Sequence, residues 1–217
     1  IAVIGFIYLP VLCDALSSLS KGRYFMFPIK KWGLDWWTKT ANSIEISQLV
    51  SNSLLIAFFV TILSTIIAFC GALAFARFSW KGKKLFQKII LMPVFFPQPV
   101  LGLALLLWFN AIGIPLSWHT AVFAHLVWIT PVVTLVIAIQ VYGFDPTLED
   151  AAKDLGATPF QIFWRVTLPL LWPGIWSGML FAFLLSWGNF PLSLYTTLFQ
   201  SGCTLRWLQV IPQWYQH

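Results

Sequence analysis

The 217-residue chain has few charges and many apolar side chains: 9% of its residues are charged, 59% are apolar and its mean hydropathy is +0.81. About a quarter of the residues of a soluble domain are charged, so these values exclude an ordinary soluble protein and indicate a chain that crosses a membrane several times. The formal net charge of +6 does not indicate nucleic-acid binding, because the basic residues lie near the ends of apolar segments, where membrane proteins keep them.

Runs of about 20 mostly apolar residues mark membrane-spanning helices. We predict five spans, at about 1–17, 48–76, 89–109, 121–142 and 173–198. The predicted fold class is therefore all-α, a polytopic bundle of transmembrane helices that forms a single transmembrane domain over residues 1–217. Because the chain starts at Ile1 without an initiator Met or a signal-peptidase site, we expect the first span to be clipped.

The second span carries Ser64, Ala68 and Ala72 at four-residue spacing. Small residues in such a row let helix backbones approach closely in lipid. This pattern favours packing within the bundle, and a contact with another subunit is the alternative.

The loop after the second span, residues 77–88, holds five basic residues and no acidic one. Lys and Arg in short loops favour the cytoplasmic side. The first loop is also basic but contains acids, so we follow the denser, unopposed charges. Residues 77–88 are predicted to be cytoplasmic, and residues 143–172 lie on the same side by span count.

Ionisable groups are scarce in the predicted spans, where they are costly and kept for function. For His125, near the start of the fourth span, we favour a hydrogen bond to a neighbour or a place near headgroups over a proton relay. The chain has no Gly-x-x-x-x-Gly-Lys-[Ser/Thr] loop, no His-Glu-x-x-His motif or plausible Ser–His pairing, and no metal-ligand spacing among its three cysteines. We therefore predict no catalytic residue, metal or cofactor in this chain, and energy for transport must come from a partner.

Prolines interrupt several spans, among them the third, which carries Pro93, Pro97 and Pro99 near its start. Broken backbone at membrane depth is tolerated where it faces protein or a water-filled cavity. The sequence Trp187-Gly188-Asn189-Phe190-Pro191 is our candidate for such a break. Trp187, Asn189 and Pro191 are accordingly predicted to line a translocation pathway, and a kink that only improves packing is an equal alternative.

Residues 145–169 form a polar insert that contains four of the seven acidic residues. Thr147 and Asp150 have the spacing of a capping box, in which each side chain bonds a backbone N–H at the start of a helix. Four apolar residues then share one helix face, and Gly156 follows where a helix ends in a residue tolerant of positive φ. That face is formed by Leu148, Ala151, Ala152 and Leu155.

A second short helix is predicted directly afterwards. Thr158 is its N-cap, Pro159 its first residue and Gln161 the partner in a second capping box. We expect Pro169 to end it. Helices this short are unstable in isolation, so they must be held by tertiary or subunit contacts. The second apolar face contains Phe160, Phe163, Trp164, Thr167 and Leu168.

Asp150-Ala151-Ala152, Gly156 and Val166-Thr167-Leu168-Pro169 resemble the EAA signature of inner-membrane permease subunits of binding-protein-dependent ABC importers. Asp150 replaces a Glu and Val166 an Ile. In that family this loop forms coupling helices that insert into a cleft on the ATPase subunit. The resemblance implies a coupling loop at about 143–172, with these ATPase-coupling residues: Glu149, Asp150, Ala151, Ala152, Gly156, Ala157, Phe160, Val166, Leu168 and Pro169.

The likeness extends over about residues 1–197 and is greatest to the spermidine/putrescine permease type. It implies a multi-pass protein of the bacterial inner membrane, surrounded by lipid. Its implied partners are ATPase subunits that bind the ATP, a second homologous permease subunit and a periplasmic solute-binding protein. Specificity in such importers resides largely in the binding protein, so a polyamine is the expected substrate, with ferric iron or a sulfate-type anion as alternatives. A passive channel or facilitator is the alternative class, and a membrane-bound enzyme ranks third.

The family has a sixth span after a periplasmic stretch, but residues 199–217 are polar and too short to cross a bilayer. We expect a truncation, or a change of reading frame after about Thr197, to account for this tail.

Overall fold

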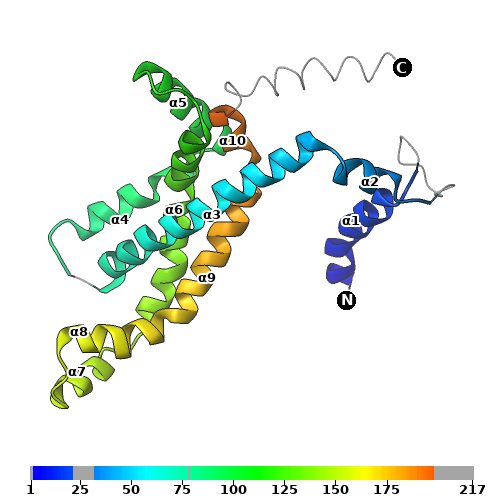
Figure 1. The fold of residues 1–217 in the computed structure, drawn as a ribbon. Coiled ribbons are helices and arrows are strands. Elements are labelled where there is room, and N and C mark those ends of the chain that lie inside the picture. The colour runs from blue at the N-terminus through cyan, green and yellow to red at the C-terminus, as the bar shows by residue number, and fades with distance from the viewer. Residues whose placement is uncertain (1, 22–31, 78, 198–217) are drawn as a thin grey trace. The chain divides into compact units, whose positions relative to one another are not determined.

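The computed structural model describes residues 2–21, 32–77 and 79–197 (Figure 1). These residues are mainly helical, and the β-structure found among them is one isolated bridge between Ser20 and Trp32. The all-α prediction is confirmed. The chain divides into two compact units, Ile1–Asn52 and Ser53–His217. The expectations about the C-terminal tail fall outside the described residues.

The first unit contains α1 (Ala2–Ser18), α2 (Asp35–Ala41) and the start of α3 (Ile44–Ala72). Lys21 and Asp35 form an ion pair of 3.1 Å, and the Gly33 N–H donates to the Leu19 carbonyl at 2.9 Å. These contacts hold the end of α1 near the start of α2.

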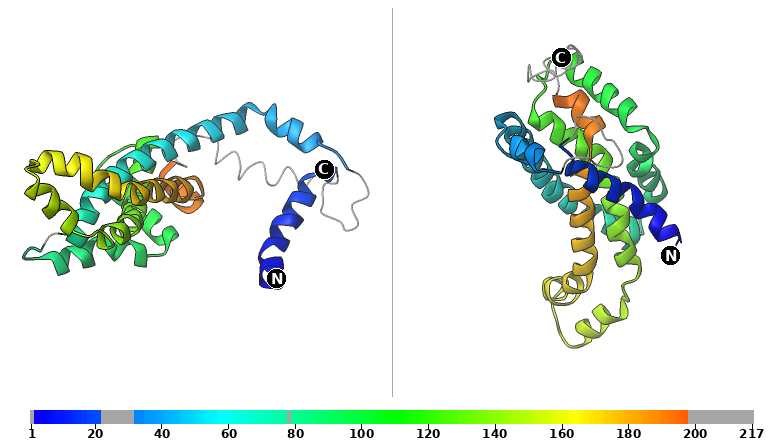
Figure 2. Two further views of the ribbon diagram at one scale, coloured as in Figure 1. Left: turned by 90° about the horizontal axis from the view of Figure 1, so that it is seen from below. Right: turned by 90° about the vertical axis from the view of Figure 1, so that its right-hand side faces the viewer.

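The second unit is organised around α6, which packs against α9, α10, η1 and η2. Figures 1 and 2 both show α6 and α9 side by side, with α7 and α8 projecting at one end of the pair. Besides the rest of α3, the elements of this unit are η1 (Leu73–Arg77), α4 (Lys83–Leu91), η2 (Met92–Phe95), α5 (Gln98–Ala111), α6 (Trp118–Tyr142), α7 (Thr147–Asp154), α8 (Pro159–Ile162), η3 (Phe163–Thr167), α9 (Leu168–Trp187) and α10 (Phe190–Thr197).

Within the described part of the chain, three helical segments are long and apolar enough to cross a membrane: Ile44–Arg77, Trp118–Tyr142 and Pro159–Trp187. The first two confirm the predicted second and fourth spans. A bent pair, Lys83–Phe95 and Gln98–Ala111, makes a fourth if it counts as one span. The predicted first span is helical as α1, but it is a shorter apolar helix, so the count of five is not reproduced.

The region of the predicted third span at 89–109 is interrupted, as its prolines indicate: the chain bends by 102° between η2 and α5. Phe96 at the bend is extended, with ψ 135°. It precedes Pro97, and a residue before proline is driven out of the helical region. The prolines indicate this break in the sequence, although the apolar run continues across it.

The predicted fifth span at 173–198 is displaced. The helix starts at Pro159 and ends at Trp187, and α10 begins after a break at Gly188 and Asn189. Pro169 does not end the preceding helix. A wider π turn, η3, comes directly before α9, and Pro169 lies in the first two positions of α9. Such a local π adjustment accommodates the carbonyl that a proline cannot pair.

A row of small residues brings α9 against α6. Gly174, Gly178, Ala182 and Ser186 are all buried at four-residue spacing. A Cβ added at Gly178 would lie 2.8 Å from Ile137 Cγ1, so the backbones approach too closely for a larger residue. The corresponding row in α3, Ser64, Ala68 and Ala72, is fully buried, which confirms packing within the bundle as its role.

Replacing Gly178 with leucine is expected to destabilise the second unit, because the added side chain must displace Ile137 on α6. Overpacking of this kind costs about 1–3 kcal/mol. The measurement is the thermal unfolding midpoint of the detergent-solubilised chain. Gly5→Leu is the control, since nothing lies within 4 Å of a Cβ added at Gly5. Equal midpoints for the two variants would contradict the packing account.

Candidate partner-coupling site

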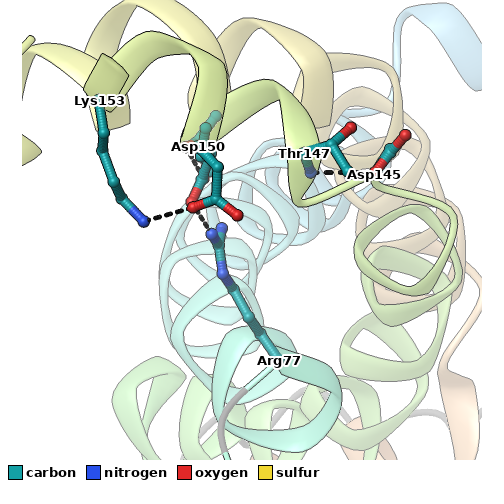
Figure 3. Close-up of polar contacts among 7 residues, drawn as sticks. Arg77, Asp145, Thr147, Asp150 and Lys153 are labelled. Atoms are coloured by element: carbon teal, nitrogen blue, oxygen red, sulfur yellow. Dashed lines mark hydrogen bonds and ion pairs between the residues drawn. The ribbon is translucent and has the colours of Figure 1, made fainter.

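The start of α7 differs from the prediction. The Thr147 backbone N–H donates to the Asp145 carboxylate at 3.0 Å, and this hydrogen bond holds the pKa of Asp145 below its ordinary value. Asp150 accepts a hydrogen bond from Lys153 at 2.7 Å instead of reaching back to the backbone (Figure 3). The predicted Thr147–Asp150 capping box is therefore wrong, because the Asp145 side chain already accepts from the Thr147 N–H that Asp150 would have paired.

The end of α7 confirms the expected role of Gly156. Its φ is +80°, a value that glycine adopts without steric cost. The Gly156 N–H donates to the Lys153 carbonyl at 2.8 Å, and the Ala157 N–H donates to the Ala152 carbonyl at 3.1 Å. These two bonds form a Schellman motif, which pairs the last carbonyls of the helix.

The start of α8 confirms the second capping box. The Thr158 N–H donates to Gln161 Oε1 at 2.9 Å, and the Gln161 N–H donates to Thr158 Oγ1 at 3.4 Å. Pro159 is the first helical residue. The turn between α7 and α8 is thus fixed by local hydrogen bonds on both sides of Gly156.

The face of α7 that packs inside the chain is not the apolar face that the sequence indicates. Glu149 is buried, whereas Leu148 is 46% exposed and Leu155 is 89% exposed. On the following helix Phe160 is 72% and Trp164 is 53% exposed. We call Leu148, Leu155, Phe160 and Trp164 the apolar tip. None of the residues that the structure describes covers it.

Glu149 faces inward because it meets two donors from distant segments. The Arg77 guanidinium at the end of η1 and the Thr167 hydroxyl in η3 both donate to its carboxylate. Figure 3 shows Arg77 reaching toward α7. Arg77 also lies over the Phe144 ring, 5.3 Å from its centroid. We call Arg77, Glu149 and Thr167 the Glu149 cluster.

The charge state of Glu149 follows from this cluster. Burial alone raises the pKa of a carboxyl group, because it penalises the ionised form. The hydrogen bonds from Arg77 and Thr167, together with the Arg77 charge, outweigh that effect and hold the pKa of Glu149 below its ordinary value. Glu149 is therefore ionised, and the cluster joins α7 to the end of the Ile44–Arg77 segment and to the start of α9.

Sequence reasoning placed Glu149 in the loop but missed Arg77 and Thr167 as its hydrogen-bond partners and Phe144 as the ring that Arg77 covers. The available signal was that residues 77–88 and 143–172 were assigned to the same side of the membrane, and the ion pair agrees with that shared side. The remaining predicted coupling residues differ in how far the rest of the chain covers them. Ala151 and Pro169 are exposed, and Ala152, Val166 and Leu168 are half-buried.

The predicted pathway residues surround the break between α9 and α10. Trp187 is 46% exposed and stacks on Phe183, with ring centroids 6.2 Å apart. Asn189 is buried, and its Oδ1 accepts from the Leu192 N–H at 3.4 Å. Pro191 is half-buried in α10. Asn189 thus caps α10, and the pathway role of the three residues stays a prediction.

His125 lies close to the same break. It is buried in α6, with Nδ1 2.9 Å from Ser186 Oγ and Nε2 3.0 Å from Ser193 Oγ. The favoured interpretation, a histidine hydrogen-bonded to a neighbour, is confirmed. Both neighbours are serines, so the expectation that the spans offer no Ser–His pairing is wrong. His125 connects α6 to the helices on both sides of the break.

The chain resembles known transport proteins. The family model described as "Binding-protein-dependent transport system inner membrane component" matches residues 64–215. The spermidine/putrescine transport system permease protein PotC of Haemophilus influenzae is 30% identical over 195 residues, 90% of this chain and 76% of the relative. The putrescine permease PotI of Escherichia coli (strain K12) is 31% identical, covering 83% and 66%. The molybdenum permease ModB of Haemophilus influenzae is 32% identical, covering 70% and 71%.

Among solved structures, a bacterial ABC transporter involved in the import of the acidic polysaccharide alginate matches with a TM-score of 0.59. The identity is 18%, and the match covers 89% of this chain and 76% of the other. At this identity the likeness establishes the fold alone. The family match spans more than half of the chain and includes α6 to α10 with the EAA-like segment. The chain therefore belongs to the family of binding-protein-dependent transport system inner membrane components.

Proposed function

We propose that residues 143–172 couple this permease subunit to an ATPase subunit, which binds and hydrolyses the ATP. The observation that carries the proposal is the apolar tip, exposed on a turn that is fixed from within by Gly156 and the Glu149 cluster. Exposed apolar patches of this kind mark interaction sites. A complementary cleft on the ATPase would cover Leu155 and Phe160, while Asp150 and Lys153 lie at its polar rim.

The Glu149 cluster supplies a route for movement. When two ATPase subunits close, they would pull the coupling loops of two permease subunits together. In this chain Glu149 would pass that displacement to Arg77 at the end of the Ile44–Arg77 segment and to Thr167 before α9. These contacts join α7 to the Ile44–Arg77 segment and to α9. The joined helices would therefore move as a group around a central path, and no single helix would move alone. Trp187, Asn189 and Pro191 are the proposed lining of that path.

The remaining parts of the assembly follow from family membership. We propose a second homologous permease subunit as the partner within the membrane and a periplasmic solute-binding protein as the source of substrate. The proposed location is the bacterial inner membrane. The chain would form part of the solute pathway and would couple it to the ATPase, without an ATPase site of its own.

The proposed substrate is a polyamine such as spermidine or putrescine. The support is that the PotC and PotI relatives, which match 83–90% of this chain, are a spermidine/putrescine permease and a putrescine permease. A molybdenum permease matches over 70% of it, so an oxyanion is the alternative to test, with ferric iron and sulfate-type anions in the same comparison. Specificity in such importers depends largely on the binding protein.

The test is uptake in cells that lack their own polyamine importers and that express the chain with its ATPase, second permease and binding protein. We expect ATP-dependent uptake of radiolabelled putrescine or spermidine, and none of molybdate. Molybdate uptake without polyamine uptake would contradict the substrate. Solute flux through the chain without any ATPase would contradict the importer class and favour a passive facilitator.

A further inference from the structure

The helix α4 begins close to the membrane surface. It follows the membrane-spanning segment Ile44–Arg77 after only residues 78–82, and its first residue is Lys83. Trp80 in this connection is 44% exposed, and its indole N–H donates to the Ala74 carbonyl at 3.3 Å. Tryptophan is enriched where membrane meets water. An exposed tryptophan directly after a spanning segment favours a place for the start of α4 at the level of the lipid headgroups.

One face of α4 is anchored to the rest of the unit. Gln87 Nε2 donates to the Phe75 carbonyl at 3.1 Å, and Lys83 Nζ donates to the Ala76 carbonyl at 3.4 Å. Both acceptors are in η1, the last turns before Arg77. This anchoring fixes which sides of α4 face outward.

The outward side of α4 divides into two stripes. Lys84 and Lys88 are exposed and lie one turn apart, and Lys81 is exposed in the turn before them. Beside them Leu85, Ile89 and Met92 are exposed by 63%, 60% and 57%, at spacings of four and three residues. Adjacent basic and apolar stripes are typical of a helix that lies in a membrane interface.

The chain offers the three lysines no acidic partner nearby. There is no Asp or Glu between Glu45 and Asp145, and the ion pairs found among the described residues involve Lys21, Arg77 and Lys153 instead. These lysines are therefore available to an anion from outside this chain. A negatively charged lipid headgroup meets that need at the depth where α4 begins.

We propose that Lys81, Lys84 and Lys88 bind the phosphate headgroups of anionic phospholipids in the leaflet next to the coupling loop, while Leu85, Ile89 and Met92 contact the acyl chains. The basic stripe favours an anionic ligand. The apolar stripe favours a ligand that also carries hydrocarbon chains. This site is independent of the solute that the transporter carries. It would hold α4, and through its bonds to η1 the Arg77 end of the spanning segment, at a fixed depth.

The test compares lipid binding by the full chain in neutral detergent, measured by native mass spectrometry. The probe is phosphatidylglycerol, with phosphatidylcholine as the neutral control. Lys84→Gln/Lys88→Gln is expected to weaken phosphatidylglycerol binding about 30-fold, from about 1 kcal/mol per lysine. Lys153→Gln/Arg165→Gln removes two positive charges from other exposed positions and is expected to leave the affinity unchanged. Added salt should weaken wild-type binding.

Three outcomes would overturn the proposal. The first is unchanged phosphatidylglycerol affinity in Lys84→Gln/Lys88→Gln. The second is competition by inorganic phosphate at concentrations similar to those of the lipid, which would indicate a site for the free anion. The third concerns the apolar stripe: if Leu85→Cys, in a chain without its native cysteines, crosslinks to the second permease subunit in the assembled transporter, protein rather than lipid covers it.

Discussion

Replacing Gly156 with valine is expected to abolish solute uptake while the chain still reaches the membrane. The φ of +80° at this position costs an L-residue about 1–2 kcal/mol and is least suited to a β-branched side chain. The chain relieves that strain by changing the turn, which moves Leu155 and Phe160 relative to α7. A strain of about 2 kcal/mol corresponds to roughly a 30-fold shift between turn conformations.

The measurement is uptake together with ATP hydrolysis by the assembled transporter. We expect hydrolysis to continue without transport, since the ATPase site itself is untouched. Gly113→Val is the matched control, because Gly113 also has positive φ, +72°, and nothing lies within 4 Å of an added Cβ at either glycine. Similar losses of uptake in both variants would show that backbone strain alone is responsible and would remove the special role of Gly156.

Replacing Arg77 with methionine is expected to destabilise the assembled transporter, because it leaves the ionised Glu149 carboxylate buried without its cation. Breaking a fully buried pair costs about 3–5 kcal/mol. The Arg77 side chain is 28% exposed, so solvent screening reduces the expected loss to about 2 kcal/mol. For a chain of this size that loss lowers the unfolding midpoint by about 4–8 °C.

A double-mutant cycle with Glu149→Gln isolates the interaction. The variant lacking both charges is expected to be more stable than the sum of the single losses predicts, by about 0.5–3 kcal/mol. Lys153→Gln is the control, since it removes an exposed ion pair with Asp150 that solvent screens, and it is expected to leave the unfolding midpoint nearly unchanged. Strict additivity of the two losses would mean that Arg77 and Glu149 do not act as a pair.

The pH dependence of stability provides a separate check on Glu149. The folded state lowers the pKa of this carboxyl group from its ordinary value of 4.5. Its contribution is therefore fully present above that value and is lost as the pH falls through the lower native-state pKa. Between about pH 7 and about pH 3, Glu149→Gln is expected to lose less stability than the wild type.

Local signals in the sequence were sufficient for much of this site. The Thr158–Gln161 capping box and the positive φ at Gly156 depend on neighbouring residues only, and both are present. The capping box at Thr147 failed because Asp145, two residues earlier, competes for the same backbone N–H. Local patterns identify candidates for a cap, and geometry decides between them.

Long-range contacts explain most of the other differences. Periodicity placed Leu148 and Leu155 on one apolar face of α7 but could not show which face packs inside the chain. The ion pair with Arg77, 72 residues away, turns Glu149 inward. Pro93, Pro97 and Pro99 indicated an interruption of the third span, but not the size of the bend before α5, which is 102°. The Gly174–Gly178 row was readable by the same four-residue spacing that was recognised in the second span.

The most direct test of the account is crosslinking from the apolar tip in the assembled transporter. Leu155→Cys, in a chain whose native cysteines are replaced, provides an attachment point at a position that is 89% exposed in this subunit. We predict a crosslink to the ATPase subunit, formed during ATP-driven uptake, and uptake that stops once the crosslink has formed. ATP-driven uptake with no crosslink from Leu155→Cys, or from Phe160→Cys, to any ATPase subunit would contradict the coupling role of this loop.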